Sequence, residues 1–479
     1  MVLMGLFGNL FKSKEKQKVV VLGLNGSSAA ALSNIIYEYP DVQIDVYTAD
    51  ETKPFVTAVP AYMHKVKDEF SDADIRFVTA TNIQQLSESI HIHNHTLFGG
   101  LDTNSKRVTI QNLDDETEEL VTYDKLLYAL PAVVSLPDIP GIFSRRILPY
   151  QNAADFLQIE TDLKRLENSG RAFKGLNIAI FGQGYDTAEL AVRAKNGGAN
   201  VTYIAARNNG KFANNENIFR QKMLGRLEEF GVKVIFEQDI RKFEEDGLKV
   251  KVNFENGEQV VVDYVFALST PVPDTKLLRN VIDLGKSDEI IVNEYLETSQ
   301  ADVLASGSST GIGFAISRTF EYLPMQKKAI RQGAVAGLNM FKRTAVTAGT
   351  QSSSGVNVFG MSFYRTGMSV DVAENFDMSA DSVTITDQYR PEYMKTNETI
   401  TITLVYDRHD RIILGAQLMS MIDIAQSVNT LTIAIQNRMT IDELSFVDML
   451  FQPNFDRPFN YLNLAAQAAV AKEASVFNN

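Results

Sequence analysis

The chain has 479 residues, of which 45% are hydrophobic and 22% are charged, and this composition predicts a globular protein of roughly three domains. Its net charge of −13 argues against a general nucleic-acid-binding protein, because neutralising phosphates requires clustered lysine and arginine. The chain has no cysteine, which excludes disulfides and thiolate metal sites and is typical of a cytoplasmic protein, and no apolar run reaches the ~18 residues of a membrane span.

The N-terminal extension, residues 1–17, carries an amphipathic helical pattern. Five apolar residues occupy one helix face and lysines follow them; these residues are Leu3, Leu6, Phe7, Leu10 and Phe11, then Lys12, Lys14, Lys16 and Lys18. The pattern predicts a helix on a membrane surface, which would place the protein peripherally at the inner face of the membrane. A helix that packs on the protein, or on a partner through residues 3–18, explains the pattern equally well. A single short helix would bind a membrane weakly, so attachment would depend on dimerisation.

Residues 18–48 have the strand, turn, helix and strand pattern that opens a dinucleotide-binding unit. Gly23 can form the tight turn after the first apolar run. Two other positions depart from the fingerprint. Ser28 replaces the glycine that allows close packing of helix on strand, and Thr48 replaces the acid that binds the adenosine ribose. These exchanges favour a retained scaffold over a nucleotide site.

The same pattern returns in residues 176–204, where Gly182 and Gly184 remain. Thr187 occupies the position of the third glycine, and Ala205 occupies that of the ribose-binding acid. The unit is either a nucleotide site or a scaffold that has kept the fold. Two loop cations could contact the additional phosphate of NADP, although solvated loop cations are commoner; they are Arg207 and Lys211.

Two polar clusters are explained without a functional site. His91, His93 and His95 alternate along a predicted strand, so they would share one face and could bind zinc or nickel. Strand alternation alone also places half-exposed polar side chains in this way, and no carboxylate or thiol neighbours them in sequence. The acidic run 114–119 predicts a solvated hairpin tip. The sequence therefore assigns no metal site.

Four long and specific strings lie in the C-terminal part, at residues 389–394, 414–420, 434–440 and 451–463. They resemble the dimerisation domain of bacterial NADH oxidases. Together with the two nucleotide units, they make the chain similar to the pyridine nucleotide-disulfide oxidoreductase superfamily, in particular to NADH oxidases, NADH peroxidases and coenzyme A-disulfide reductases. The resemblance runs from about Lys18 to about Val470.

This resemblance implies an α/β fold with two Rossmann-like domains, of FAD and NAD type, and a C-terminal α+β domain that builds a homodimer. The implied domains follow the N-terminal extension in chain order. They are the first part of the FAD-type domain (18–150), the NAD-type domain (151–270), the second part of the FAD-type domain (271–345) and the dimerisation domain (346–479).

The chain departs from the family at its functional motifs. The redox cysteine, which cycles through sulfenate or mixed-disulfide states beside the flavin, aligns with Ala58 in the segment 53–61. The active-site histidine aligns with Gly26, and the histidine contributed across the dimer aligns with Asn454. Ser308 replaces the aspartate that holds the ribityl-phosphate region, and two further turns are altered, at 129–131 and 270–275. Glu189 matches a family glutamate near the nicotinamide, although a helix residue kept for hydrogen bonding would look the same.

These losses predict a non-catalytic homologue, a pseudoenzyme that acts as a dimeric scaffold or regulator without a cofactor. Each lost flavin partner costs on the order of 1–3 kcal/mol. In this interpretation no residue is catalytic, and the remnant cofactor-binding positions are Gly23, Gly182, Gly184 and Glu189. Two alternatives stay open: an oxidoreductase that uses FAD and NAD(P)H with thiol-free chemistry, such as direct reoxidation of reduced flavin by oxygen, and a binding module that senses a nucleotide.

Overall fold

The computed structural model describes residues 16–49, 83–133, 135–150, 173–182, 184–205, 217–236, 238–268 and 271–477. Ala58, Arg207, Lys211 and most of the N-terminal extension lie outside these residues, so the predictions made for them stay predictions. Among the described residues, no helix has the length and apolar character needed to cross a membrane.

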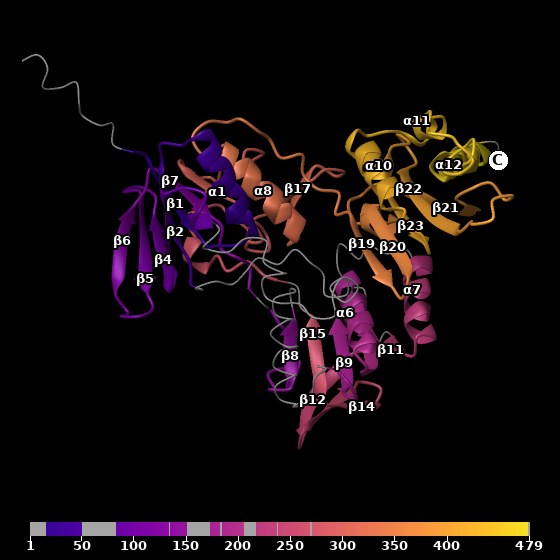
Figure 1. The fold of residues 1–479 in the computed structure, drawn as a ribbon, viewed down its shortest axis with the longest axis horizontal. Coiled ribbons are helices and arrows are strands. Elements are labelled where there is room, and N and C mark those ends of the chain that lie inside the picture. The colour runs from indigo at the N-terminus through magenta and orange to yellow at the C-terminus, as the bar shows by residue number, and fades with distance from the viewer. Residues whose placement is uncertain are drawn as a thin grey trace, which may run out of the picture.

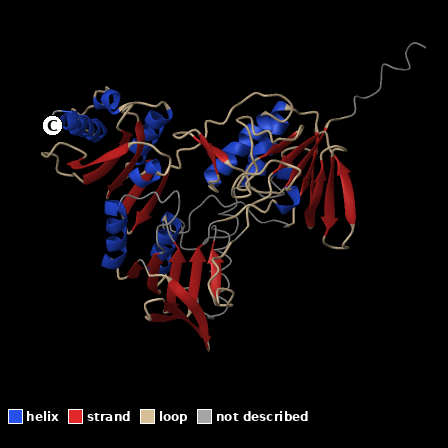
Figure 2. Ribbon diagram, turned by 180° about the vertical axis from the view of Figure 1, so that it is seen from behind, coloured by secondary structure: helices blue, strands red, loops and turns tan. Residues whose placement is uncertain are grey.

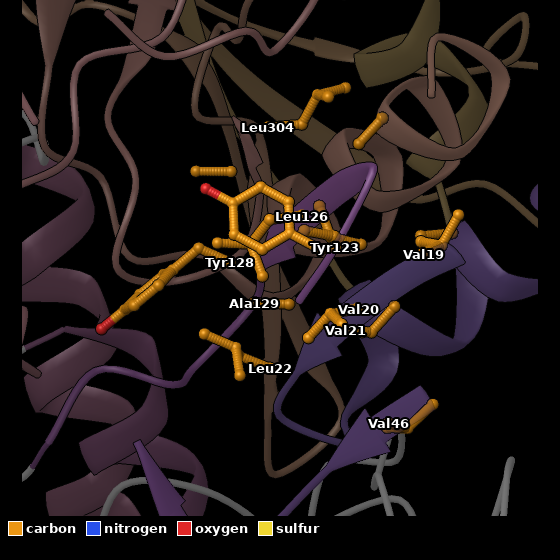
Figure 3. Close-up of a cluster of buried hydrophobic side chains, with 14 of the residues drawn as sticks. Val19, Val20, Val21, Leu22, Val46, Tyr123, Leu126, Tyr128, Ala129 and Leu304 are labelled. Carbon is orange, nitrogen blue, oxygen red and sulfur yellow. The ribbon is translucent and has the colours of Figure 1, made fainter. Parts of the chain in front are cut away.

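The first sheet has five parallel strands in the order β16–β7–β1–β2–β3. Val19, Val20 and Val21 of its central strand are fully buried, as an apolar run inside a parallel sheet should be, and Figure 3 shows them with side chains of neighbouring strands. The strands are β1 (Lys18–Leu22), β2 (Gln43–Tyr47), β3 (Ile90–His93), β7 (Lys125–Tyr128) and β16 (Val303–Ala305).

Helices α1 (Gly26–Glu38) and α8 (Gln326–Leu338) pack against each other beside this sheet, as Figure 1 shows. Two glycines of α8 permit the close approach. A Cβ atom on Gly333 would lie 1.9 Å from the carbonyl oxygen of Ser27, and one on Gly337 would lie 2.4 Å from that of Ala31. Residues 326–338, distant in sequence, thereby join the first unit.

A three-stranded antiparallel sheet flanks this unit, in the order β4–β5–β6. Its strands are β4 (Thr96–Asp102), β5 (Arg107–Asn112) and β6 (Glu118–Thr122). The acidic run lies at the β5–β6 connection, which confirms the predicted hairpin tip. The prediction that three histidines share one strand face is wrong for His95. β3 ends at His93, and His95 lies in the following turn with a φ of 54°. No cluster of metal-ligating side chains occurs in the described part of the chain.

The second sheet is also parallel, with the order β11–β10–β9–β15–β8. It is followed by a small antiparallel sheet, β12–β13–β14. The elements of this unit are β8 (Ile147–Tyr150), β9 (Asn177–Gly182), α6 (Tyr185–Asn196), β10 (Asn200–Ala205), α7 (Asn217–Glu229), β11 (Lys233–Phe236), β12 (Ile240–Asp246), β13 (Lys249–Phe254), β14 (Gln259–Val262) and β15 (Tyr264–Leu268).

The C-terminal unit is an antiparallel sheet, β19–β20–β23–β22–β21, against which α10 and α12 pack, as Figure 2 shows from behind. Val356, Val358 and Phe363 of this sheet share a core with the second unit. The elements of this unit are β19 (Ser354–Val358), β20 (Met361–Gly367), α9 (Val370–Glu374), β21 (Ala380–Gln388), β22 (Thr399–Asp407), β23 (Ile413–Ser420), α10 (Ala425–Gln436), α11 (Ile441–Ser445) and α12 (Tyr461–Phe477). Strands β17 (Ile312–Phe314) and β18 (Thr319–Glu321) form a separate two-stranded sheet, and a 3₁₀ turn at Lys276–Leu278 contacts β4 of the first unit.

Candidate functional site

The first candidate site lies at the carboxyl end of β1, where ligands bind in open parallel sheets. Gly23 forms the turn with a φ of 93°, and a Cβ atom at this position would lie 2.8 Å from the carbonyl oxygen of Ala129. The glycine is therefore required both by the backbone conformation and by the close approach of the chain that follows β7. The predicted tight turn is present in the structure.

The amino terminus of α1 is capped by the chain's own Asn25. The Oδ1 atom of Asn25 accepts hydrogen bonds from the backbone N–H groups of Ser27 at 2.9 Å and Ser28 at 3.4 Å. Ser28 Oγ in turn accepts from the backbone N–H of Asn25 at 2.8 Å, and Asn25 Nδ2 donates to the carbonyl of Ala129 at 2.6 Å. Ser28, noted above only as a lost glycine, therefore completes a capping box. A phosphate at this terminus would have to displace Asn25 Oδ1.

The turn after β16 closes the same edge of the sheet. Ser306 Oγ lies 2.7 Å from Ser27 Oγ, and the backbone N–H of Gly307 donates to Gln332 Oε1 at 3.3 Å. Ser308, at the position of the family aspartate, accepts a hydrogen bond from the backbone N–H of Ala132 at 2.9 Å. The serine side chains thus hold the turns of β1, β7 and β16 together.

The amino terminus of α8 is the other element of the first candidate site. Its N-cap residue, Met325, makes no side-chain cap, so the helix presents N–H groups that a ligand oxygen can accept. Lys328 is only 2% exposed, and its Nζ donates to the carbonyl oxygen of Thr310 at 2.6 Å. Burial lowers the pKa of Lys328 to about 7, although the nearby charge of Glu289 opposes the shift. This lysine can therefore hold or release a proton near neutral pH.

The helix terminus of the second nucleotide unit, unlike that of the first, has no side-chain cap. Gly184 is the N-cap of α6 and makes no side-chain cap, which leaves the helix terminus available to an anion. Gly184 has a φ of 90°, in the region that favours glycine. Thr187 is fully buried and lies so close to Gly182 that a Cβ atom there would be 2.9 Å from Thr187 Oγ1. The helix and strand therefore pack closely although the third glycine is absent.

Glu189 is a buried carboxyl group on α6. It is 7% exposed, and burial, reinforced by the negative charge of Asp186, raises its pKa to about 8. The side chain is therefore mostly protonated at neutral pH and can donate a hydrogen bond. Strongly perturbed carboxyl groups of this kind concentrate at functional sites.

Three units meet at the start of α6. The guanidinium of Arg365, on β20, lies 5.3 Å from the ring centroid of Tyr185, and Arg365 Nε donates to Ser354 Oγ at 2.7 Å. Lys327 of α8 donates to the carbonyl of Ser353, and burial lowers the pKa of Lys327 to about 8. The hydroxyl of Tyr185 is buried and has no hydrogen-bond partner among the described residues. No sequence motif points to Tyr185, Lys327 or Arg365, because their contacts join distant segments.

The segment 446–459 presents exposed apolar side chains around Asn454, the position of the family's cross-dimer histidine. Such a patch marks an interaction surface. The exposed fractions are 77% for Phe446, 72% for Leu450, 50% for Phe451, 66% for Phe455 and 48% for Phe459.

Comparison with known proteins decides the family. A model of the pyridine nucleotide-disulphide oxidoreductase family matches residues 17–333, and the model of its dimerisation domain matches residues 355–461. The chain belongs to the pyridine nucleotide-disulphide oxidoreductase family. The predicted α/β fold, with two nucleotide-binding Rossmann-like domains and a C-terminal dimerisation domain, is confirmed.

Three relatives show which members of the family the chain resembles over its whole length. An NADH oxidase of Enterococcus faecalis is 30% identical over 95% of this chain and 99% of its own length. The water-forming NADH oxidase of Lactobacillus brevis, solved with NADH, is 30% identical with a TM-score of 0.88 over 96% of this chain and all of its own. An engineered mutant of that enzyme, a water-forming NADPH oxidase solved with NADPH, gives the same identity, coverage and TM-score.

These relatives overturn the prediction of a non-catalytic pseudoenzyme. Full-length similarity to several named NADH oxidases points to a catalytic oxidoreductase. The prediction failed because it counted the side chains lost from each motif. Backbone N–H groups and buried ionisable side chains, which the motifs do not record, supply much of the binding chemistry at such sites.

The residues of this family member fit the nucleotides that the family implies. FAD fits the backbone at three places: Gly23, the turn at Gly307 and the uncapped terminus of α8. The uncapped terminus of α6 and the unpartnered hydroxyl of Tyr185 fit a nicotinamide dinucleotide. Thr48 and Ser308 lack the carboxylates that would bind the sugar hydroxyls, so the site fits FAD with fewer side-chain contacts.

Proposed function

We propose that the protein is an FAD-dependent oxidoreductase that oxidises NAD(P)H and passes the electrons to oxygen without a thiol. One observation supports this proposal above all: Tyr185 and Glu189 lie on the same helix, α6, whose amino terminus has no side-chain cap. The chain is also similar to NADH oxidases over its whole length. A scaffold would have no need for a buried carboxyl, or for a hydroxyl that lacks a partner among the described residues, beside an uncapped helix terminus.

The residues of α6 would bind and orient the nicotinamide coenzyme. The N–H groups of its first turn would donate hydrogen bonds to the pyrophosphate. The hydroxyl of Tyr185 would donate a hydrogen bond to an acceptor on the coenzyme. Glu189, protonated at neutral pH because its pKa is raised to about 8, would donate a hydrogen bond to an acceptor on the coenzyme. Arg365 would keep Tyr185 in place through the stacking contact.

FAD, when bound, would supply the two-electron chemistry that links the nicotinamide to an electron acceptor. Gly23, Gly307 and the first turn of α8 would hold it, with the ammonium of Lys328 behind that turn. Because Thr48 and Ser308 each replace a carboxylate, FAD should bind about 30- to 20,000-fold more weakly than with both partners present, at ~1–3 kcal/mol for each contact.

The absence of cysteine determines the product of oxygen reduction. The chain has no thiolate that could reduce a peroxide further. The balanced reaction is therefore NAD(P)H + H⁺ + O₂ → NAD(P)⁺ + H₂O₂, in which the two electrons removed from the nicotinamide end on the peroxide oxygens. Lys328 Nζ can supply or hold a proton near neutral pH.

The test is to saturate the purified protein with FAD and to measure NADH oxidation, oxygen consumption and peroxide together. We expect one H₂O₂ for each NADH and each O₂, and flavin that is released on gel filtration. No flavin binding and no NADH oxidation would overturn the proposal. Consumption of two NADH for each O₂ with no peroxide would refute hydrogen peroxide as the product and leave the oxidase function intact.

The dimerisation domain and the exposed apolar segment 446–459 support a homodimer, which we include in the proposal. The domain bounds given above and the attachment of residues 3–18 to a membrane surface or a protein partner remain predictions.

A further inference from the structure

The carboxyl end of β10 lacks the group that selects NADH. In dinucleotide-binding units, an acid at this position hydrogen-bonds the 2′-hydroxyl of the adenosine ribose and repels a 2′-phosphate. Here the residue is Ala205, which is 7% exposed at the last position of the strand. A methyl group neither accepts a hydrogen bond nor repels an anion. The site has therefore lost both the attraction to NADH and the barrier to NADPH.

A cation lies over the residue that pairs with Ala205 on the neighbouring strand. Ala205 pairs in register with Phe236, the last residue of β11, and paired strands lie about 4.8 Å apart. The ring of Phe236 is 38% exposed, and the guanidinium of Arg220, on α7, lies 4.7 Å from its centroid. The ring thus holds a planar cation at the edge of the sheet where the adenosine end of a coenzyme would lie.

Arginine has the chemistry that a 2′-phosphate requires. Its guanidinium is always charged and can donate two parallel hydrogen bonds to phosphate oxygens. A 2′-hydroxyl, by contrast, gains little from a neighbouring cation. An arginine near an alanine at the end of β10 therefore favours the phosphorylated ribose.

The engineered NADPH oxidase supports the role of Ala205, although its cations are introduced by two arginine substitutions that follow its alanine. Its substitutions change a glycine to alanine and, further along the chain, an aspartate to alanine. The spacing between those two positions equals the spacing between Thr187 and Ala205, the two fingerprint departures of the second unit. The present chain carries, without engineering, a non-glycine residue and an alanine at this spacing.

We propose that the second nucleotide unit selects NADPH over NADH, with Ala205 admitting the 2′-phosphate and Arg220 binding it. This inference rests on the proposed function, because it concerns the coenzyme of the same site. It assigns a specificity role to Arg220, which lies on α7, outside the glycine fingerprint.

The first experiment measures binding rather than turnover. Calorimetry on the FAD-saturated protein compares 2′-phospho-ADP-ribose with ADP-ribose, which differ only in the 2′-phosphate. We expect the phosphorylated ligand to bind about 10- to 100-fold more tightly, the usual value of a hydrogen bond to a charged group. Equal binding, or tighter binding of ADP-ribose, would overturn the inference.

Three variants identify the residues responsible. Arg220→Gln should weaken 2′-phospho-ADP-ribose about tenfold or more and leave ADP-ribose unchanged. Ala205→Asp should reverse the preference by repelling the phosphate and accepting from the 2′-hydroxyl. Lys222→Gln removes an exposed cation from the same helix and should not change the affinity for either ligand. If Arg220→Gln and Lys222→Gln have equal effects, the preference reflects only the total positive charge of the helix, and the role of Arg220 is refuted.

Turnover separates this inference from the proposed function. The ratio of kcat/KM for NADPH to that for NADH should exceed ~10 and fall in Arg220→Gln. Oxidation of NADH with no preference for NADPH would refute the inference and leave the proposed function intact. Failure to oxidise either coenzyme, with no binding of either adenosine ligand, would overturn both.

Discussion

Replacement of Glu189 by glutamine tests whether this buried carboxyl is protonated in the folded protein. Its pKa is about 8 in the fold and 4.5 in an unfolded chain. Between these values the folded protein keeps a proton that the unfolded chain has lost. The contribution of Glu189 to the free energy of unfolding is therefore complete below pH 4.5 and is lost as the pH rises towards 8.

The size of the effect follows from the shift. At 1.36 kcal/mol for each pKa unit, the full shift corresponds to ~5 kcal/mol, and relaxation around the carboxylate would reduce it to ~3 kcal/mol. Glutamine has a similar shape and no charge to bury. Glu189→Gln should thus resemble the wild type at pH 4.5 and be ~3–5 kcal/mol more stable at pH 9.

The assay is urea unfolding of both proteins at pH 5, 7 and 9, followed by circular dichroism. Glu228→Gln, an exposed glutamate on α7, serves as the control for removing one carboxylate and should not alter the pH dependence. If Glu189→Gln and the wild type lose stability in parallel from pH 5 to pH 9, the buried carboxyl is not protonated in the fold and its proposed role as a donor fails.

Three further predictions concern other parts of the molecule. Asn25→Gly removes the cap from α1 and the hydrogen bond to Ala129, so the free energy of unfolding without cofactor should fall by about 1 kcal/mol. FAD should bind more tightly in a fluorescence titration, because a phosphate would no longer have to displace Asn25 Oδ1. Weaker FAD binding would show that Asn25 helps to hold the flavin. Phe455→Asp places a charge in the apolar segment 446–459 and should weaken dimerisation by ~2–4 kcal/mol, measured by light scattering. Phe143→Asp, at an 88% exposed phenylalanine elsewhere, should leave the dimer unchanged. Equal effects of the two variants would show that the segment is not part of the interface. Deletion of residues 1–16 should leave the dimer folded and reduce flotation with anionic vesicles, and unchanged flotation would end the membrane-anchor prediction.

The sequence was sufficient where structure follows from local pattern. Strands β1 and β9, with helices α1 and α6 after them, form where apolar runs and glycine turns predicted them, because burial in a parallel sheet requires a continuous apolar run. The hairpin tip at the acidic run is likewise local. The same reasoning failed for His95, because the strand ends before that residue and its backbone turns out of the alternation.

The motifs misled where binding depends on groups that a motif does not contain. Ser28 was interpreted as a lost glycine, yet it completes the cap of α1 with Asn25. The helix termini of α6 and α8 carry no side-chain cap, and nothing in the residue types at a fingerprint position reveals this. Counting lost side chains therefore predicted a loss of function that the full-length relatives contradict.

The sequence by itself determined the family, the order of the two nucleotide units and the absence of any thiol chemistry, because these depend on local periodicity, long specific strings and composition. Only the tertiary structure placed Arg365 against Tyr185 and Arg220 beside the strand that pairs with Ala205. Each of these arrangements joins segments that are distant along the chain. Such contacts arise from strand register and helix packing, which no local window of sequence contains.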